Sequence, residues 1–156
     1  MIRMFGEWLA TADFSGTPRV YQKFTPPQSM VITGMRTQII VYNNPAFTSL
    51  NMKIYANRSG APAGLIATST NAPTKAEITT LNHAWKEIYF DFASVGLKGG
   101  ETYHFVLSGT GYTGTTSSHI AWKHSFPDPA YQTNVTMSLE AAGVSPFDIT
   151  VFGAIL

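Results

Sequence analysis

The sequence predicts an all-β fold, a two-sheet antiparallel β-sandwich with little or no helix. Roughly ten or eleven short segments with strand character recur at spacings of about 8–12 residues, which is typical of a sandwich or barrel. Gly, Pro and Asn punctuate these segments, and none of them keeps the 3.6-residue apolar period of a helix. The length of 156 residues, with no internal repeat or linker, favours a single domain over residues 1–156.

The stretch Ala84–Leu107 has the clearest strand pattern. Apolar and polar residues alternate along Lys86–Phe92 and again along Thr102–Leu107, which marks strands with one buried face. Gly99 and Gly100 lie between them and supply a turn that tolerates positive φ. The residues expected to face the core are Ile88, Phe90, Phe92, Tyr103, Phe105 and Leu107. The residues expected to face outward are Glu87, Tyr89, Asp91, Thr102, His104 and Val106. The rest of the chain must supply a second apolar layer.

The segments before this stretch show the same signals. Met1–Leu9 is short and mixed, and we expect an edge strand or an arm that packs on a neighbour. Strands are expected at Arg19–Phe24 and Leu50–Ala56. Between them, Met30–Tyr42 is expected to form either a strand pair or one bulged strand, with Gly34 at the bend.

The remaining segments complete the predicted sandwich. Arg58–Gly64 is expected to be a compact loop, Leu65–Thr70 a strand and Glu77–Thr80 a short edge strand. Residues 108–118 are mostly Gly, Ser and Thr, so they are expected to form a loop. The closing strands are expected at His119–Ser125, Asn134–Leu139 and Phe147–Ile155.

Composition restricts the classes of function. Charged residues make up 12% of the chain, about half of the roughly 25% typical of soluble domains. Such a surface is expected where much of it is buried against partners, or in an extracellular or virion setting. A simple Thr-rich β protein is the remaining explanation. The net charge is +1 and the ten Lys and Arg residues are scattered singly, so we expect no nucleic-acid partner.

The N-terminal segment is not expected to act as a signal peptide, because Gly6, Glu7 and Asp13 interrupt its apolar residues. No run approaches the ~20 apolar residues of a membrane helix, so we expect no membrane partner. The protein is therefore expected to be cytoplasmic when made, unless it leaves by lysis or as part of a particle. Because the chain starts at its own Met and stops soon after its last strand, we expect a stand-alone module.

No constellation typical of catalysis is found. The absence of cysteine excludes a thiolate metal site and a cysteine nucleophile. His119 and His124 are five residues apart, which on a strand places them on opposite faces and disfavours a shared metal. Carboxylates could be paired from Glu87, Asp91 or Glu101, but the first two match a solvated face. The sequence predicts no enzyme, no catalytic residue, no metal and no cofactor, while a calcium ion held by loop carbonyls stays open.

Aromatic residues are the one enrichment with binding potential. A platform that stacks on sugar rings could be formed by Trp8, Trp85 and Trp122 together with Tyr55, Tyr89 and Tyr112. For Trp85 and Trp122, core or cross-strand packing is the favoured interpretation. Tyr112 is a lone aromatic residue in a Gly/Ser/Thr loop, so we expect it to have little to pack against in its own domain. The candidate glycan contacts are therefore Tyr112, Trp122 and Trp85.

The run LNMKIYANRSGAPAGLIATST at residues 50–70 is followed by WKEIYFDF at residues 85–92 and VGLKGGETYHFVLSG at residues 95–109. This succession resembles jelly-roll, carbohydrate-binding-like β-sandwich modules of phage virion proteins and bacterial surface proteins. The matching elements are Ile54-Tyr55, Gly60–Gly64, Ala67–Ser69, Trp85, Leu97–Tyr103 and Trp122. The resemblance covers about residues 30–125. The Gly60–Gly64 loop has one extra residue, so loop contacts are not transferred.

The resemblance implies a jelly-roll-like sandwich in a small structural protein of a phage particle, with the virion as its location. The expected role is a capsid decoration or cementing protein, or a head or tail fibre component. It would bind the protein lattice of capsid or tail as a symmetric homo-oligomer. The expected lattice and oligomer contacts are the apolar ends, which could equally tuck into the domain: Met1, Ile2, Met4, Phe5, Ile155 and Leu156. The alternative is a carbohydrate-binding module for host or cell-wall glycans.

Overall fold

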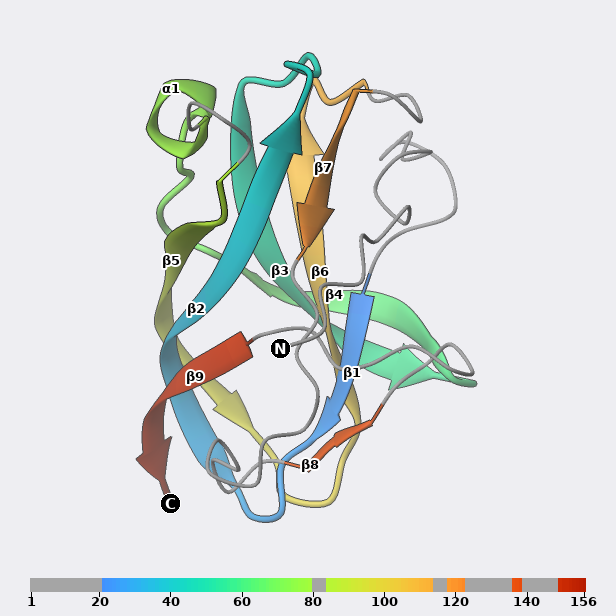
Figure 1. Cartoon of the computed structure of the whole chain (residues 1–156). Helices are drawn as coiled ribbons and strands as arrows, with labels where there is room; N and C mark the ends of the chain where they lie inside the picture. The colour runs from blue at the N-terminus through green and yellow to red at the C-terminus, as the bar shows by residue number, and fades with distance from the viewer. Residues whose placement is uncertain (1–20, 80–83, 114–117, 123–135, 139–148) are drawn as a thin grey trace.

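The structure is a computed structural model of the chain that describes residues 21–79, 84–113, 118–122, 136–138 and 149–156. In these residues, nine strands form two antiparallel sheets that pack face to face (Figure 1). The predicted all-β sandwich is therefore confirmed. The expected arm at Met1–Leu9 lies outside the described residues.

Sheet A has the strand order β4-β3-β6-β1-β8. At its centre, β3 (Ser49–Arg58) pairs with β6 (Tyr103–Thr110). Beyond β3 lies β4 (Ala61–Thr68), and beyond β6 lie β1 (Tyr21–Thr25) and then β8 (Thr136–Ser138). The strands expected at residues 50–56 and 65–70 are thus confirmed, with ends that shift by a few residues, and so is the described part of the strand expected at residues 19–24.

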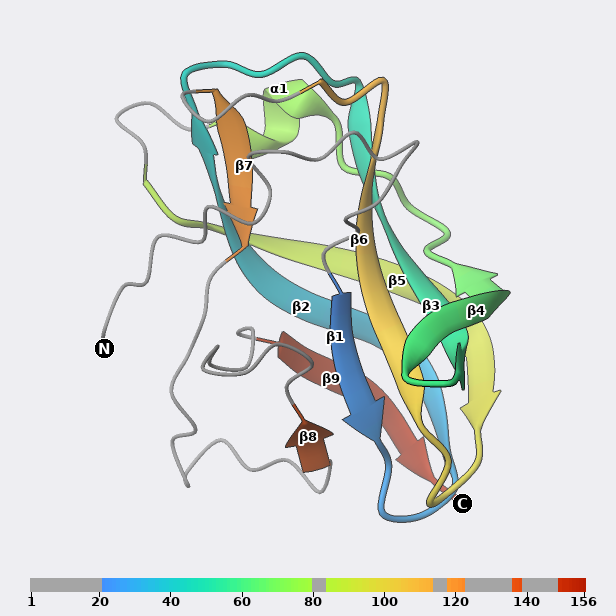
Figure 2. The ribbon, with the colours of Figure 1, turned by 90° about the vertical axis from the view of Figure 1, so that its right-hand side faces the viewer.

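Sheet B is built around β2 (Met30–Tyr42). On one side, β2 pairs with β5 (Lys86–Leu97). On the other side, its C-terminal end pairs with β7 (His119–Trp122), and its N-terminal part pairs with β9 (Ile149–Ile155). Near α1 in Figure 2, β2 and β7 form one layer while β3 and β6 form the other.

The long strand β2 settles the choice between a strand pair and one bulged strand. It runs without a break through Gly34, and its register with both β5 and β9 shifts between Ile32 and Gly34. Against β9 the extra residue lies in β2, whereas against β5 the extra residues lie in β5, between Asp91 and Val95. Such bulges increase the local twist. Of the two predicted alternatives, one bulged strand is confirmed.

The core lies between the two sheets and is mainly apolar. All six residues of the Ala84–Leu107 stretch that were expected to face the core are buried. Their strands, β5 and β6, belong to opposite sheets, so each strand supplies the apolar layer that the other needs. At the centre, the Phe24 and Phe105 rings stack with their centroids 4.8 Å apart.

The turn between β5 and β6 connects the two sheets. Gly100 has φ +77°, as the Gly99-Gly100 prediction requires, and its N–H donates to the Pro26 carbonyl at 2.8 Å. A Cβ on Gly99 would lie 2.6 Å from the Cα of Gln28, so only glycine fits there. The crossover is thus tied to the segment that links β1 to β2.

The outward face of β6 corrects one expectation. His104 and Val106 were expected to face solvent, but their side chains are 0% and 3% exposed. The Tyr21 ring packs edge-on against the His104 imidazole at 5.0 Å, and His104 Nε2 lies 2.9 Å from Asn57 Oδ1. Side chains from the two strands that flank β6, Tyr21 on β1 and Asn57 on β3, therefore pack around His104 on the outer face of sheet A.

Residues 75–78 form a short helix, so the edge strand expected at Glu77–Thr80 is wrong within the described residues. The helix α1 (Lys75–Ile78) begins with a capping box, in which Thr74 and Glu77 bond reciprocally between side chain and backbone. The motif Thr-x-x-Glu at residues 74–77 is the sequence signal that would have predicted this helix start. No described helix is long and apolar enough to span a membrane.

The compact loop expected at Arg58–Gly64 is also corrected. The turn contains only Ser59 and Gly60, with φ +53° and +86°, and β4 begins at Ala61. Two central residues with positive φ match the right-handed twist of a hairpin, so the strands continue almost to the turn.

Candidate functional site

The predicted contact residues are placed unevenly by the structure. Met1, Ile2, Met4 and Phe5 lie outside the described residues, and so does the side chain of Trp122. Trp85 is half-buried just before β5. At the other end of the chain, Ile155 and Leu156 are 48% and 77% exposed.

Tyr112 does not match its predicted surroundings. Its side chain is 5% exposed and belongs to the core cluster, and its hydroxyl accepts a hydrogen bond from the Ile120 N–H at 3.2 Å. Burial raises the pKa of the Tyr112 hydroxyl above its usual value of 10.0. The expectation that Tyr112 has little to pack against is therefore corrected, and its ring is not available to stack on a sugar.

The outer face of sheet B carries two exposed aromatic rings instead. Tyr89 on β5 is 50% exposed and Phe152 on β9 is 42% exposed. Their ring centroids are 6.4 Å apart with an angle of 16° between the planes. Gly34 lies on β2 between these strands, opposite Phe152 in the register, and it has no side chain to separate the rings. We call Tyr89 and Phe152 the aromatic patch.

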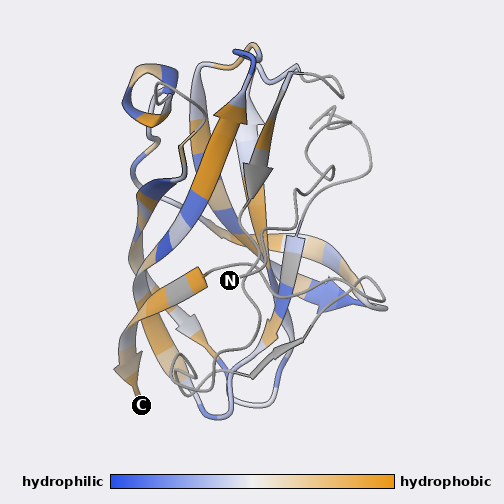
Figure 3. Cartoon of the chain, viewed as in Figure 1, coloured by the Kyte–Doolittle hydropathy of each residue, from blue (hydrophilic) through white to orange (hydrophobic). Residues whose placement is uncertain are grey.

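The apolar surface continues along β9 to the end of the chain. Figure 3 shows hydrophobic residues along this strand. The N–H of Leu156 donates to the Ser29 carbonyl at 2.9 Å, which ties the last residue to the start of β2. The exposed apolar side chains at this end are therefore held on a fixed backbone.

Polar groups border the aromatic patch. Arg36 Nη1 lies 3.1 Å from Glu87 Oε2, and the Tyr89 hydroxyl donates to Glu87 Oε1. This hydrogen bond stabilises the neutral phenol, so it raises the pKa of Tyr89 above 10.0. A guanidinium, a carboxylate and a phenol thus form one bonded group beside the rings.

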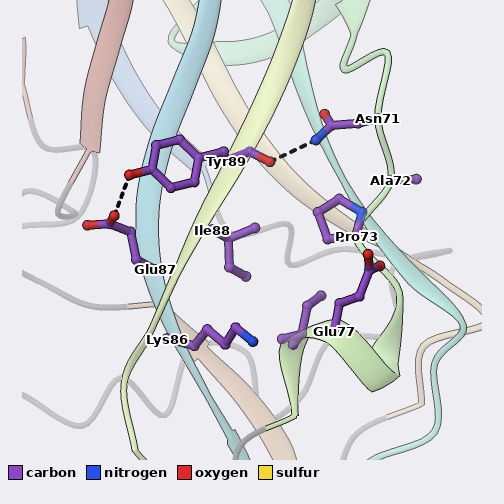
Figure 4. A pocket seen from close by; sticks show the side chains of 9 residues that line it. Asn71, Ala72, Pro73, Glu77, Lys86, Glu87, Ile88 and Tyr89 are labelled. Carbon is purple, nitrogen blue, oxygen red and sulfur yellow. Dashed lines mark hydrogen bonds between the residues drawn. The ribbon is translucent and has the colours of Figure 1, made fainter.

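A pocket of about 460 Å³ opens on the other side of β5, between this strand and α1 (Figure 4). Its lining residues are Asn71, Ala72, Pro73, Glu77, Ile78, Lys86, Glu87, Ile88 and Tyr89. Asn71 Nδ2 donates to the Tyr89 carbonyl at 2.9 Å, and Asn71 Oδ1 accepts from the Asp91 N–H at 2.7 Å. On the β5 side, the pocket is therefore bordered by the backbone of β5, to which Asn71 is hydrogen-bonded.

The carboxylates near this pocket are engaged in structural bonds. Glu77 Oε2 accepts from the Thr74 N–H, and this bond lowers the pKa of Glu77 below its usual 4.5. A general acid requires a raised pKa, so Glu77 is not arranged for that role. Among the described residues, no group of three His, Cys, Asp or Glu side chains is placed to hold a metal ion.

Sequence reasoning placed Tyr89 outward but did not connect it to Phe152. The alternation along β5 gave the orientation of Tyr89, whereas the contact depends on β9 pairing with β2. The one local signal was Gly34, because a glycine within a strand often marks a place where another group approaches closely.

The fold and the surface together define an all-β sandwich with an exposed aromatic patch and an adjacent pocket. Comparison with known proteins found no matching family model, no matching curated protein and no matching solved structure.

Proposed function

We propose that this chain is a structural protein of a phage particle, a module that binds the protein lattice of a capsid or tail by apolar contact. A capsid decoration or cementing protein, or a head or tail fibre component, fits this role. The assignment to a particle rests on the sequence resemblance. The proposed contact surface lies on the outer face of sheet B, on β9 and β5.

The observation that carries the proposal is the exposed apolar surface on the outer face of β9. Phe152 and Leu156 lie on this face and are 42% and 77% exposed, and Tyr89 adds a half-exposed ring beside Phe152. Ile155 is 48% exposed on the opposite face of the strand, where it pairs with Met30. Contiguous exposed apolar groups rimmed by polar ones are typical of interaction sites. The low charged fraction of 12% agrees with a surface that is covered in use.

The surface is suited to binding without a large rearrangement. Register with β2 holds β9 in place, and the Leu156 N–H is bonded to the Ser29 carbonyl. Because these side chains are presented on a fixed sheet, a partner that covers them loses little conformational entropy in the process. Fully burying one such side chain contributes about 1.5–3 kcal/mol.

The test measures incorporation of the chain into particles. Particles produced from the genome that encodes this chain are purified, and their protein composition is measured by mass spectrometry. We expect the wild-type chain in a fixed ratio to the major lattice protein. The double variant Phe152→Ser and Leu156→Ser should bind at least about a hundredfold more weakly, because two apolar contacts are lost.

The matched control is Leu65→Ser. Leu65 lies on β4 in sheet A and is 55% exposed, so it is comparable in exposure but on a different sheet. We expect this variant to be incorporated like the wild type. Absence of the wild-type chain from particles, or equal incorporation of the double variant, contradicts the proposal. Unfolding curves of all three proteins confirm that each one is folded.

A second candidate function is glycan binding at the aromatic patch. Nearly parallel, half-exposed rings beside the bonded group of Arg36, Glu87 and the Tyr89 hydroxyl favour it. An apolar sugar face can stack on such rings while hydroxyls bond to the planar polar groups. The Tyr89→Ala variant distinguishes the candidates: for a glycan binder it abolishes retention on a glycan array, whereas Leu156→Ser does not.

A further inference from the structure

The outer edge of β5 already pairs with an amide from its own chain. Asn71 donates from Nδ2 to the Tyr89 carbonyl and accepts at Oδ1 from the Asp91 N–H, as a peptide group of a neighbouring strand would. The Thr70 N–H donates to the Asp91 carbonyl at 2.7 Å. These bonds are made on the side of β5 that points away from β2.

The same edge continues into the pocket. In an antiparallel strand, the N–H and C=O of one residue point to the same side, and every second residue repeats that direction. Because the Tyr89 carbonyl points away from β2, the Tyr89 N–H and both backbone groups of Glu87 point that way too. Within the described residues, β5 is the last strand of sheet B, and no described strand pairs with it there.

The described part of the chain leaves this edge uncovered because residues 71–74 cross to the other sheet. After Asn71, Pro73 has no N–H to donate, and its carbonyl accepts from the Leu50 N–H on β3 at 2.9 Å. Thr74 then forms a bridge with Ser49. The pocket is the space that opens where this segment leaves β5 (Figure 4).

We propose that this pocket is a strand-addition site, in which an extended peptide segment of a partner protein pairs with the backbone of Glu87 and Tyr89. Strands pair at about 4.8 Å, and main-chain hydrogen bonds give such complexes their affinity. The N–H and C=O groups of Glu87 and Tyr89 alternate along this edge as donors and acceptors, which is the order that a paired peptide strand requires. They continue the edge that the Asn71 carboxamide already pairs with at Tyr89 and Asp91.

The lining also specifies the chemistry of the peptide. Ile78 and Ile88 are buried at the inner side of the pocket, so the peptide residue that points inward is apolar. The charged lining residues are Glu77, Lys86 and Glu87, and the Glu87 carboxylate is paired with Arg36. Glu77 and Lys86 then offset each other, which gives the pocket no strong preference for a charged peptide. An uncharged, alternating peptide with high strand propensity meets these conditions. This site is separate from the exposed β9 surface, and its test needs only the isolated chain.

The experiment titrates the ¹⁵N-labelled chain with a capped peptide of alternating Thr and Val, observed by NMR. We expect the amide signals of Glu87 and Tyr89 to shift and their hydrogens to exchange more slowly with solvent. The control peptide has the same sequence with N-methylated internal amides. It should bind at least about tenfold more weakly, because it cannot donate main-chain hydrogen bonds.

Two variants place the peptide in the pocket. Ala72 is exposed and lines the pocket, so Ala72→Trp should fill the pocket and abolish the shifts at Glu87 and Tyr89. Ala76 is exposed on α1 and is not part of the lining, so Ala76→Trp should leave the titration unchanged. The proposal is overturned if the shifts do not occur at millimolar peptide, if the N-methylated peptide binds equally, or if Ala72→Trp binds like the wild type. None of these outcomes depends on whether the chain enters a particle.

Discussion

At the scale of single residues, Tyr112 links the Gly/Ser/Thr segment to the core. Its ring is buried, and its hydroxyl accepts the Ile120 N–H. The ring is the large apolar group that this segment contributes to the core, and the hydroxyl satisfies a buried backbone donor. A residue that composition alone assigns to a loop thus stabilises the pairing of β7.

Tyr112 also makes the free energy of unfolding decrease with rising pH in the alkaline range. Its pKa is raised in the folded state, so its contribution is complete below the unfolded pKa of about 10 and is lost as pH rises through the folded pKa. We expect Tyr112→Phe to lower the free energy of unfolding by about 1–3 kcal/mol near neutral pH, because the Ile120 N–H loses its acceptor.

Urea unfolding between pH 7 and 11 checks this expectation. The Tyr112→Phe variant should lose less stability with rising pH than the wild type. Tyr89→Phe is the comparison: the pKa of Tyr89 is also raised, but its ring is half-exposed and solvent screens its interactions, so this variant should change the pH dependence less than Tyr112→Phe does. Equal slopes for wild type and Tyr112→Phe would show that the Tyr112 hydroxyl does not carry the effect.

At the scale of elements, the bulge in β2 positions the aromatic patch. A Cβ on Gly34 would lie 3.3 Å from the Phe90 carbonyl oxygen and 3.6 Å from Phe152 Cδ2. A branched side chain would therefore push against the Phe152 ring and the backbone of β5. We expect Gly34→Val to lower the free energy of unfolding by about 1–3 kcal/mol, as overpacking does.

The matched control for this prediction is Gly96→Val. Gly96 is exposed in β5, and nothing lies within 4 Å of the Cβ that it would gain. Chemical unfolding should find Gly96→Val close to the wild type, since Val favours strands. If both variants lose the same stability, the contact between Gly34 and Phe152 does not decide the effect.

At the scale of the whole molecule, the expectation of a homo-oligomer can be measured directly. Light scattering at micromolar concentration should give a defined multiple of the 17.0 kDa chain. Removal of Met1–Phe5 tests the predicted arm, and it should lower both the native mass and attachment to a lattice. A monomeric wild-type chain would count against self-assembly in solution, and unchanged attachment after truncation would count against the arm.

Much of the fold could be predicted because strand faces follow a local rule. The alternation in residues 86–92 and 102–107 correctly assigned Phe90 and Phe105 to the core. The same rule misplaced His104, because alternation says on which face a residue lies but not what covers that face. The short helix was missed where Thr74 and Glu77 form a capping box, a local signal that is easily outweighed in so strand-rich a chain.

The candidate site was much less predictable. The expected glycan contacts included Tyr112, which the structure buries, whereas the exposed aromatic patch pairs Tyr89 with Phe152. These two residues are distant in sequence, and they meet only because β5 and β9 both pair with β2. No period within one segment carries that information.

The sequence by itself determined the all-β class, the bend at Gly34 and the inward faces of β5 and β6, because each depends on residues within a few positions of one another. Only the tertiary structure decided that β5 and β6 join opposite sheets, that Tyr112 is buried, and where the pocket lies. The physical reason is that sheet membership and coverage depend on contacts between distant segments. Local alternation determines on which face of a strand a side chain lies, and long-range packing determines which segments cover that face.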